Sequence, residues 1–372
     1  MGRSDLFAVL LAGDFDPVLR AEFPGAVRAA LDGDEAPLLR LRRRAFALGG
    51  RPPPPRMLSP ALYAATTCEE TQLPWARTTP PDPAERRRQA ALFAGGAPDT
   101  AFFPFDRATA LRNDFIALCD RWPAAPTDPA FGPGPLPDVP VLLLEGQDDL
   151  RTPVENAQRV AAQFPRASLV VAPATGHGAL GGDPSGCTVT AFARFFRDRP
   201  VSGRCAPGRR PIPAVPPPPT ALRDVAPVPS VGGLRGRALG AVALTLGDVA
   251  EDALSEPLPP GGGLRGGAYR IDRQGSLVLR GVAFVPGVRV SGRIRHFALR
   301  RQRGRLHVGG PATPDGVLSV RGRRVTGRLG GVRVSARLVP ATSAARVATL
   351  AALAGTIPVN LASVTLRGPS GP

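Results

Sequence analysis

Two side chains near the middle of the chain could move a proton together. Asp149 follows the short apolar run 139–144, and His177 follows a second short apolar run, 168–173. Between these runs, Pro153 and apolar residues at helical spacing predict a helix. This strand–helix–strand order predicts two parallel strands, each buried on both faces, whose carboxyl ends meet at one edge of a sheet. We therefore expect Asp149 and His177 to lie close together.

A histidine beside a carboxylate has a definite chemical use. Imidazole has an ordinary pKa of about 6.5, so it can take up and release a proton near neutral pH. A buried carboxylate fixes its tautomer and orientation. Alone, Asp149 would be read as a turn residue or helix cap, and His177 as an ordinary loop residue. Together, at the ends of two neighbouring strands, they predict the acid and the base of a catalytic triad.

The residues around this pair resemble a known family. The segment from Gly146 to Pro153 has the pattern G-x-x-D-x-x-T-P, and His177 lies in G-H-G. Both patterns are similar to those in the C-terminal part of α/β-hydrolases of the tripeptidyl/prolyl aminopeptidase-like (TAP-like) group, and the resemblance covers roughly residues 1–207. It implies that Asp149 is the triad acid and Asp148 a neighbour. It also implies an exported serine hydrolase that acts on peptide N-termini and needs no cofactor.

The expected nucleophile is not present in the sequence. The family carries it as a serine in G-x-S-x-G before the acid, but no serine here has that context, and Ser185 follows the histidine. Three explanations were weighed: a fragment whose N-terminal hydrolase half is missing, a half-enzyme that pairs with another chain, and a protein that has lost activity. We favour the fragment. The backbone amides that stabilise the oxyanion would also come from the missing half.

The first 137 residues read as helices with short loops, with a stiff Pro-rich connector near residue 51. The resemblance implies that this region is a helical cap over the active site. It also implies that Glu69 and Glu70 bind the free ammonium group of a peptide substrate, because charge-assisted hydrogen bonds are strong. The alternative is that both carboxylates are a solvated helix end.

The four cysteines are Cys68, Cys119, Cys187 and Cys205. None lies in C-x-x-C and the chain has 3 histidines, so a zinc site is not expected. Four buried thiols are one alternative, and an even number also permits disulfides. The short spacing of Cys187 and Cys205 suggests a local link, and the resemblance implies this pair together with Cys68–Cys119. Disulfides indicate an oxidising compartment, so we expect a secreted or cell-envelope protein. No apolar run is long enough for a transmembrane helix.

Charge divides the chain into two parts. All 47 basic residues are Arg, and the 24 Arg and 7 acidic residues of 206–372 carry the whole net charge of +17. Residues 206–229 are rich in proline and predict a linker. From residue 230 the sequence alternates apolar residues with Arg, Ser or His, which predicts a basic antiparallel β domain over 230–345 with one solvated face, followed by a tail over 346–372.

The basic face could bind an anionic envelope polymer. Nucleic acid is not expected as a partner, since this region offers few aromatic residues for stacking, namely Tyr269, Phe284 and Phe297. The simplest interpretation is that this face only contacts solvent and that its arginines reflect a biased codon usage. The predicted fold class is therefore α/β: the C-terminal part of an α/β-hydrolase, with its cap and last two strands, followed by an all-β domain. The alternatives to an aminopeptidase are an esterase of small substrates and an inactive envelope-binding protein.

Overall fold

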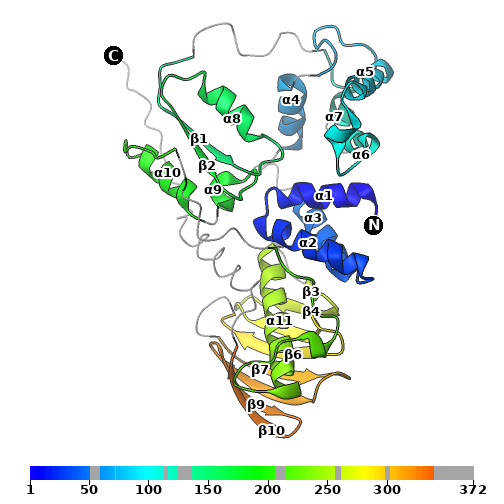
Figure 1. Cartoon of the computed structure of the whole chain (residues 1–372), viewed down its shortest axis with the longest axis vertical. Coiled ribbons are helices and arrows are strands. Elements are labelled where there is room, and N and C mark those ends of the chain that lie inside the picture. The colour runs from blue at the N-terminus through cyan, green and yellow to red at the C-terminus, as the bar shows by residue number, and fades with distance from the viewer. Residues whose placement is uncertain are drawn as a thin grey trace.

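The structure is a computed structural model (Figure 1). It describes residues 1–50, 59–71, 73–112, 116–124, 136–183, 185–203, 205, 214–255, 261–297 and 302–338. The predicted tail over 346–372 lies outside the described residues. In the described helices, none is long and apolar enough to cross a membrane.

Three helices at the N-terminus pack on one another in the middle of the molecule (Figure 1). They are α1 (Arg3–Gly13), α2 (Pro17–Leu31) and α3 (Ala36–Gly50). Asp16 caps α2, because its carboxylate accepts the backbone N–H groups of Val18 and Leu19. A small apolar core lies between the helices and is made of Val9, Leu19, Ala26 and Leu41.

A second group of helices follows, as predicted from the sequence. It consists of α4 (Pro60–Glu70), α5 (Pro83–Gly95), a 3-10 turn (Asp99–Phe102), α6 (Arg107–Arg112) and α7 (Ile116–Cys119). The disulfide Cys68–Cys119 ties α4 to α7. Buried Arg86 donates to the carbonyl oxygen of Trp122 at 2.6 Å and lies over the ring of Trp75. The group is thus held by a covalent link and a buried cation rather than by a large core.

The predicted α/β unit is present next. Strand β1 (Val141–Gly146) pairs in parallel with β2 (Ala167–Ala172), and α8 (Val154–Ala161) crosses between them. Two more helices, α9 (Ala179–Gly182) and α10 (Cys187–Phe195), complete the unit, and the disulfide Cys187–Cys205 closes it. One expectation was wrong: the side chains of β1 from 141 to 144 are only half-buried. Among the described residues β1 has β2 as its one partner, so its other edge is not covered by a strand.

The C-terminal region forms an antiparallel sheet of eight strands, as the alternating sequence predicted. The strands follow one another in space in their order along the chain, from β3 to β10. They are β3 (Gly261–Gly263), β4 (Gly266–Ile271), β5 (Leu277–Val282), β6 (Arg289–Arg295), β7 (Arg303–Gly309), β8 (Gly316–Arg321), β9 (Arg324–Leu329) and β10 (Val332–Arg337).

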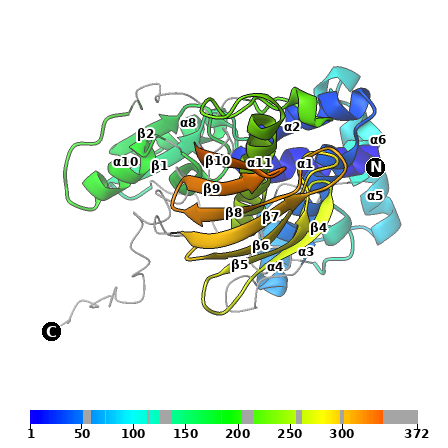
Figure 2. The same cartoon turned by 90° about the horizontal axis from the view of Figure 1, so that it is seen from below.

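A long helix, α11 (Gly233–Ser255), covers one face of this sheet (Figures 1 and 2). The period-two reading from residue 230 missed it. Its buried residues recur at helical spacing and include Ala238, Leu239, Val242 and Val249. They share one core with buried strand residues such as Leu277, Ile294 and Leu318. A sheet with one apolar face needs a covering layer, and α11 supplies it.

Helix α3 docks on α11 through buried charges. Arg40 donates to Asp248 at 2.7 Å, and Arg44 lies 3.3 Å from Glu251 and 3.4 Å from Asp252. The Pro-rich segment also touches the N-terminal helices, since Val215 donates to the carbonyl oxygen of Ala21 at 2.7 Å. The two halves of the chain therefore meet at a defined interface. The domain boundaries proposed from the sequence stay a prediction.

Candidate acid–histidine site

Asp149 and His177 lie at the carboxyl ends of β1 and β2. Because β1 and β2 are parallel and in register from Val141 to Gly146, their carboxyl ends lie at the same edge of the sheet. The two side chains meet there, with His177 Nδ1 at 2.9 Å from Asp149 Oδ2. Of the two neighbouring aspartates, Asp149 is the buried one that faces the histidine, whereas Asp148 is exposed and pairs with Arg20 at 3.4 Å.

The loop after β1 prepares Asp149 to carry a negative charge. Its Oδ1 accepts the backbone N–H groups of Arg151 at 2.7 Å and Thr152 at 2.9 Å. The Thr152 hydroxyl donates to Oδ2 at 2.8 Å. Burial favours the neutral acid, but the hydrogen bonds from Thr152, Arg151 and His177 outweigh it and hold the pKa of Asp149 well below its usual range. Asp149 is thus an ionised carboxylate at neutral pH.

A second carboxyl group, Glu145, lies behind Asp149 at the end of β1. It is buried, and its Oε1 accepts the backbone N–H of Gly146 at 3.0 Å. Burial and a hydrogen bond with the Asp149 carboxyl raise the pKa of Glu145 to about 7. One of two adjacent carboxyl groups has a raised pKa because two negative charges at short range repel each other. With a pKa of about 7, Glu145 is partly protonated at neutral pH, whereas Asp149 keeps its charge.

Asp14, between α1 and α2, is the residue at this site that the sequence analysis missed. It is 3% exposed, and its Oδ1 accepts the backbone N–H groups of both Leu150 and His177 at 3.2 Å. The next residue, Phe15, contacts the imidazole ring edge-to-face at 5.2 Å between centroids. Only the folded chain brings Asp14 here, because no spacing rule links it to residues 136 or more positions away.

Three side chains of this site carry atoms that metal ions bind. Asp14, Asp149 and His177 each offer one atom within 4.8 Å of the others, which makes them the one such group in the described part of the chain. However, Nδ1 and Oδ2 already hydrogen-bond to each other, and Arg151 lies 3.6 Å from Asp14. A guanidinium beside the carboxylate opposes a metal cation electrostatically. The arrangement fits an acid–histidine pair better than a metal centre.

Glu69 and Glu70 take up different surroundings at the end of α4. Glu69 accepts a hydrogen bond from the indole N–H of Trp122 at 2.6 Å, and Glu70 is exposed. Within the described residues, no contact joins either carboxylate to Asp149 or His177. Their role in binding a substrate ammonium stays a prediction. All four cysteines form the two predicted disulfides, Cys68–Cys119 and Cys187–Cys205.

The two nitrogens of the His177 imidazole differ in their surroundings. In the described part of the chain, both hydrogen bonds of the ring use Nδ1, to Asp149 and to the Thr152 hydroxyl at 3.2 Å. The histidine side chain is 34% exposed. Thr152 lies on the Nδ1 side, so it orients the ring rather than acting as the nucleophile that Nε2 would activate. The site can therefore bind and release a proton at Nε2 for a group that approaches from outside.

Comparison with known protein families finds a match over the segment that contains this site. Residues 104–204 match the model of a family described as TAP-like protein, an α/β-hydrolase family. The match includes β1, β2, Asp149 and His177, and it includes neither α1–α3 nor the eight-stranded sheet. No match was found among curated proteins or among solved structures. The expected resemblance to TAP-like α/β-hydrolases is confirmed for this segment, and it supports a hydrolase.

Proposed function

We propose that the TAP-like segment is the acid–histidine part of a serine hydrolase that acts on peptide N-termini. His177 is the general base, and Asp149 orients it. The observation that carries the proposal is the 2.9 Å contact between His177 Nδ1 and the ionised carboxylate of Asp149. The family match to a hydrolase over the same residues supports it.

The chemistry follows from the two sides of the imidazole. Nδ1–H donates to Asp149 Oδ2, which leaves Nε2 as the atom that accepts a proton. A serine hydroxyl placed at Nε2 loses its proton to the ring as its oxygen attacks the substrate carbonyl. The carboxylate then stabilises the imidazolium, and Nε2 returns the proton to the leaving amine. Thr152 keeps the ring in place during both transfers through its hydroxyl group.

The nucleophile belongs, in this proposal, to a polypeptide segment outside the described residues. The sequence contains no G-x-S-x-G motif. The second edge of β1 lacks a strand partner among the described residues, and the half-buried side chains from 141 to 144 leave apolar surface beside it. A further strand of an α/β-hydrolase sheet would add at this edge, and the segment that supplies it would also carry the nucleophile turn. That segment would also supply the amides of the oxyanion hole.

The finer assignments depend on the resemblance. An aminopeptidase binds a free ammonium, and Glu70 is an exposed carboxylate that could do so. Glu69 would act by fixing the helix end through Trp122. Two disulfides are compatible with an exported protein, and we propose a secreted or envelope location.

The test supplies the missing part. The full chain alone should not hydrolyse aminoacyl anilides or acyl esters. Mixed with a separately expressed nucleophile-bearing half of a TAP-like hydrolase, it should turn them over. His177→Ala or Asp149→Asn should lower the rate of that turnover by about 10²–10⁴-fold. Turnover that does not depend on His177, in a mixture shown by size exclusion to form the complex, would refute the assignment. A preference for esters over anilides would favour the small-substrate esterase.

A second candidate is an inactive envelope-binding protein, in which the C-terminal sheet is the active part. The lack of a nucleophile motif and the concentration of positive charge in residues 206–372 favour it. Under this alternative the complemented mixture would show no turnover at all, while the sheet would still bind its anionic partner.

A further inference from the structure

Five arginines lie directly opposite one another on five neighbouring strands of the C-terminal sheet. The register pairs each with the next across β6, β7, β8, β9 and β10, in the order Arg295, Arg303, Arg321, Arg324 and Arg337. We refer to these five residues as the arginine row. Adjacent strands are about 4.8 Å apart, so the row is a line of positive charges that runs across the strands.

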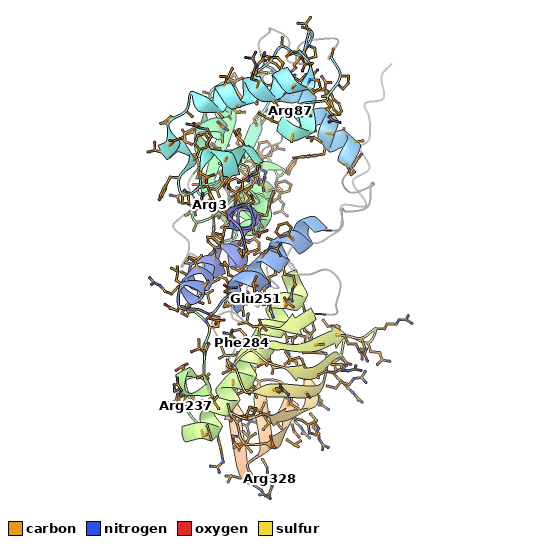
Figure 3. All side chains as sticks on the ribbon, turned by 90° about the vertical axis from the view of Figure 1, so that its right-hand side faces the viewer. Arg3, Arg87, Arg237, Glu251, Phe284 and Arg328 are labelled. Atoms are coloured by element: carbon orange, nitrogen blue, oxygen red, sulfur yellow. A yellow bond between two sulfur atoms is a disulfide. The ribbon has the colours of Figure 1, made fainter. Side chains whose placement is uncertain are left out.

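The arginine row lies on the face of the sheet that α11 does not cover. The five arginines are exposed, and the residues beside them along each strand that point the other way are buried, such as Ile294, Val320 and Val325. Figure 3 shows nitrogen-tipped side chains that project from the strands on the side away from α11. The row is therefore accessible from solvent along its whole length.

Within the described residues, none of the five side chains makes a hydrogen bond or an ion pair. Other arginines of the same face do find partners: Arg293 pairs with Asp272, and Arg328 donates to the carbonyl oxygen of Gly331 at 3.0 Å. Like charges placed directly opposite one another destabilise a sheet. Five of them in succession, with no ion-pair partner among the described residues, make a surface that an external polyanion would stabilise.

The next line of residues adds hydroxyl donors. Parallel to the arginine row, the same face carries Arg293, Arg305, Ser319, Thr326 and Ser335 at successive opposite positions. A shallow hollow of about 740 Å³ adjoins them, and its lining includes Thr326, Arg328 and Arg333 together with one acidic residue, Asp315. A ligand along the arginine row could thus accept hydrogen bonds from guanidinium and hydroxyl groups at once.

We propose that the arginine row binds a linear polymer of phosphate groups without bases, which lies across the strands. Arginine recognises phosphate through parallel N–H groups, and the non-bridging oxygens of each phosphate group have lone pairs left for the hydroxyls of the second line. This binding goes beyond the proposed hydrolase function, because it uses no residue of the Asp149–His177 site.

Nucleic acid and membrane fit this surface less well. Single-stranded nucleic acid binds through stacking on aromatic rings, but the described positions of this face on β6–β10 hold no Phe, Tyr or Trp, and His307 is their one ring. Membrane-surface binding combines basic groups with large apolar residues that enter the lipid. The exposed large hydrophobic residues on these strands are Val317 and Val332.

The experiment measures the binding of inorganic polyphosphate to the full chain by calorimetry at several salt concentrations. The triple variant Arg303→Gln/Arg321→Gln/Arg324→Gln removes the centre of the row. We expect at least about tenfold weaker binding at about 0.1 M salt, and a salt dependence of log affinity that is shallower by about 2–3 units of slope. The control Arg159→Gln/Arg197→Gln/Arg199→Gln removes the same charge from exposed positions elsewhere and should bind as the native chain does.

Further arms separate the alternatives. Replacement of the same three row residues by Lys keeps the charge, so it should retain the salt slope while losing part of the affinity. Retained near-ultraviolet circular dichroism checks that each variant is folded. If the row variant and the control variant lost the same amount of polyphosphate affinity, net charge alone would explain the binding and the arginine row would not be the site. Binding as tight to single-stranded DNA, to heparin or to vesicles with anionic lipid would overturn a base-free phosphate polymer, and no polyphosphate binding would overturn the proposal entirely.

Discussion

Asp14 Oδ1 accepts the backbone N–H of His177, and the same oxygen accepts the N–H of Leu150. One atom from the α1–α2 loop therefore holds the loop that carries the acid and the loop that carries the histidine. Gly176 fits closely against it, since a Cβ there would lie 2.3 Å from the Asp14 carbonyl oxygen. The spacing between Asp149 and His177 thus depends on a segment outside the strand–helix–strand unit.

Asp14→Ala should loosen this site. It leaves two partly buried N–H groups without an acceptor, which costs up to about 1–3 kcal/mol for each group that stays unsatisfied. Urea unfolding measures the loss of stability, and the ¹⁵N and ¹H signals of the His177 imidazole report whether the ring becomes mobile.

Asp14→Asn is the matched control, because its side-chain oxygen can still accept both hydrogen bonds. It should keep the imidazole signals of the native chain. If Asp14→Ala left those signals sharp and unshifted, the role of Asp14 in positioning His177 would be disproved.

Asp149→Asn should lower stability at neutral pH and flatten its acid dependence. The folded pKa of Asp149 lies below the ordinary value, so its contribution is present above about pH 3.8 and is lost as the pH falls below it. Hydrogen bonds to a charged group contribute about 1.5–3 kcal/mol each, and Asn weakens several at once. The free energy of unfolding of the native chain and of Asp149→Asn is measured at pH 7, 4 and 3. If the difference between them did not shrink as the pH falls, the depressed pKa of Asp149 would be contradicted.

Glu145→Gln should have the opposite pH dependence. The folded pKa of Glu145 is raised to about 7 from its ordinary value of 4.5. Its contribution is therefore fully present below about pH 4.5 and is lost as the pH rises through about 7. Each unit of difference between folded and unfolded pKa is worth about 1.4 kcal/mol. Glutamine stays neutral, so the variant should gain stability relative to the native chain between pH 5 and pH 8. If the difference in unfolding free energy between Glu145→Gln and the native chain stayed constant across this range, the raised pKa of Glu145 would be contradicted.

The local unit around the site could be predicted from sequence, whereas its long-range partners could not. Strand, helix and turn signals lie within residues 139–177, and parallel strands force their ends together, so Asp149 and His177 could be paired in advance. Asp14 gave no such signal, because an aspartate after a helix reads as a cap or turn residue. The two disulfides could be predicted from their spacing and the family resemblance together.

The C-terminal region shows the same division. Alternation from residue 230 onward predicts strands, and the structure has them from residue 261. Helix α11 was missed because its small residues, such as Gly236 and Gly240, resemble the Gly-rich turns that follow. Both glycines are needed for close packing, since a Cβ at Gly236 would lie 1.6 Å from the carbonyl oxygen of Val231. The cross-strand register that creates the arginine row also depends on turn geometry, which the alternation alone does not fix.

The last prediction concerns the buried cluster between α3 and α11. Arg44 is buried and pairs with Glu22 at 2.8 Å, with Glu251 and with Asp252. Burial and a hydrogen bond with the Glu22 carboxyl raise the pKa of Glu251 to about 9, so Glu251 is neutral at pH 7 while Asp252 stays beside three arginines. Arg44→Met removes the cation that Glu22 and Asp252 face, and we expect a loss of about 3–5 kcal/mol.

The partner variants separate charge from packing in this cluster. Arg44→Met/Glu22→Leu removes an ion pair instead of leaving half of it buried, so it should recover part of the lost stability. Glu251→Gln should flatten the fall in stability between pH 4.5 and about 9, because the raised pKa of Glu251 makes its contribution full below 4.5 and lost as the pH rises through 9. Thermal unfolding at pH 6 and pH 9 measures both effects. If Arg44→Met unfolded at the native temperature in a single transition, the buried charges would not hold α3 on α11.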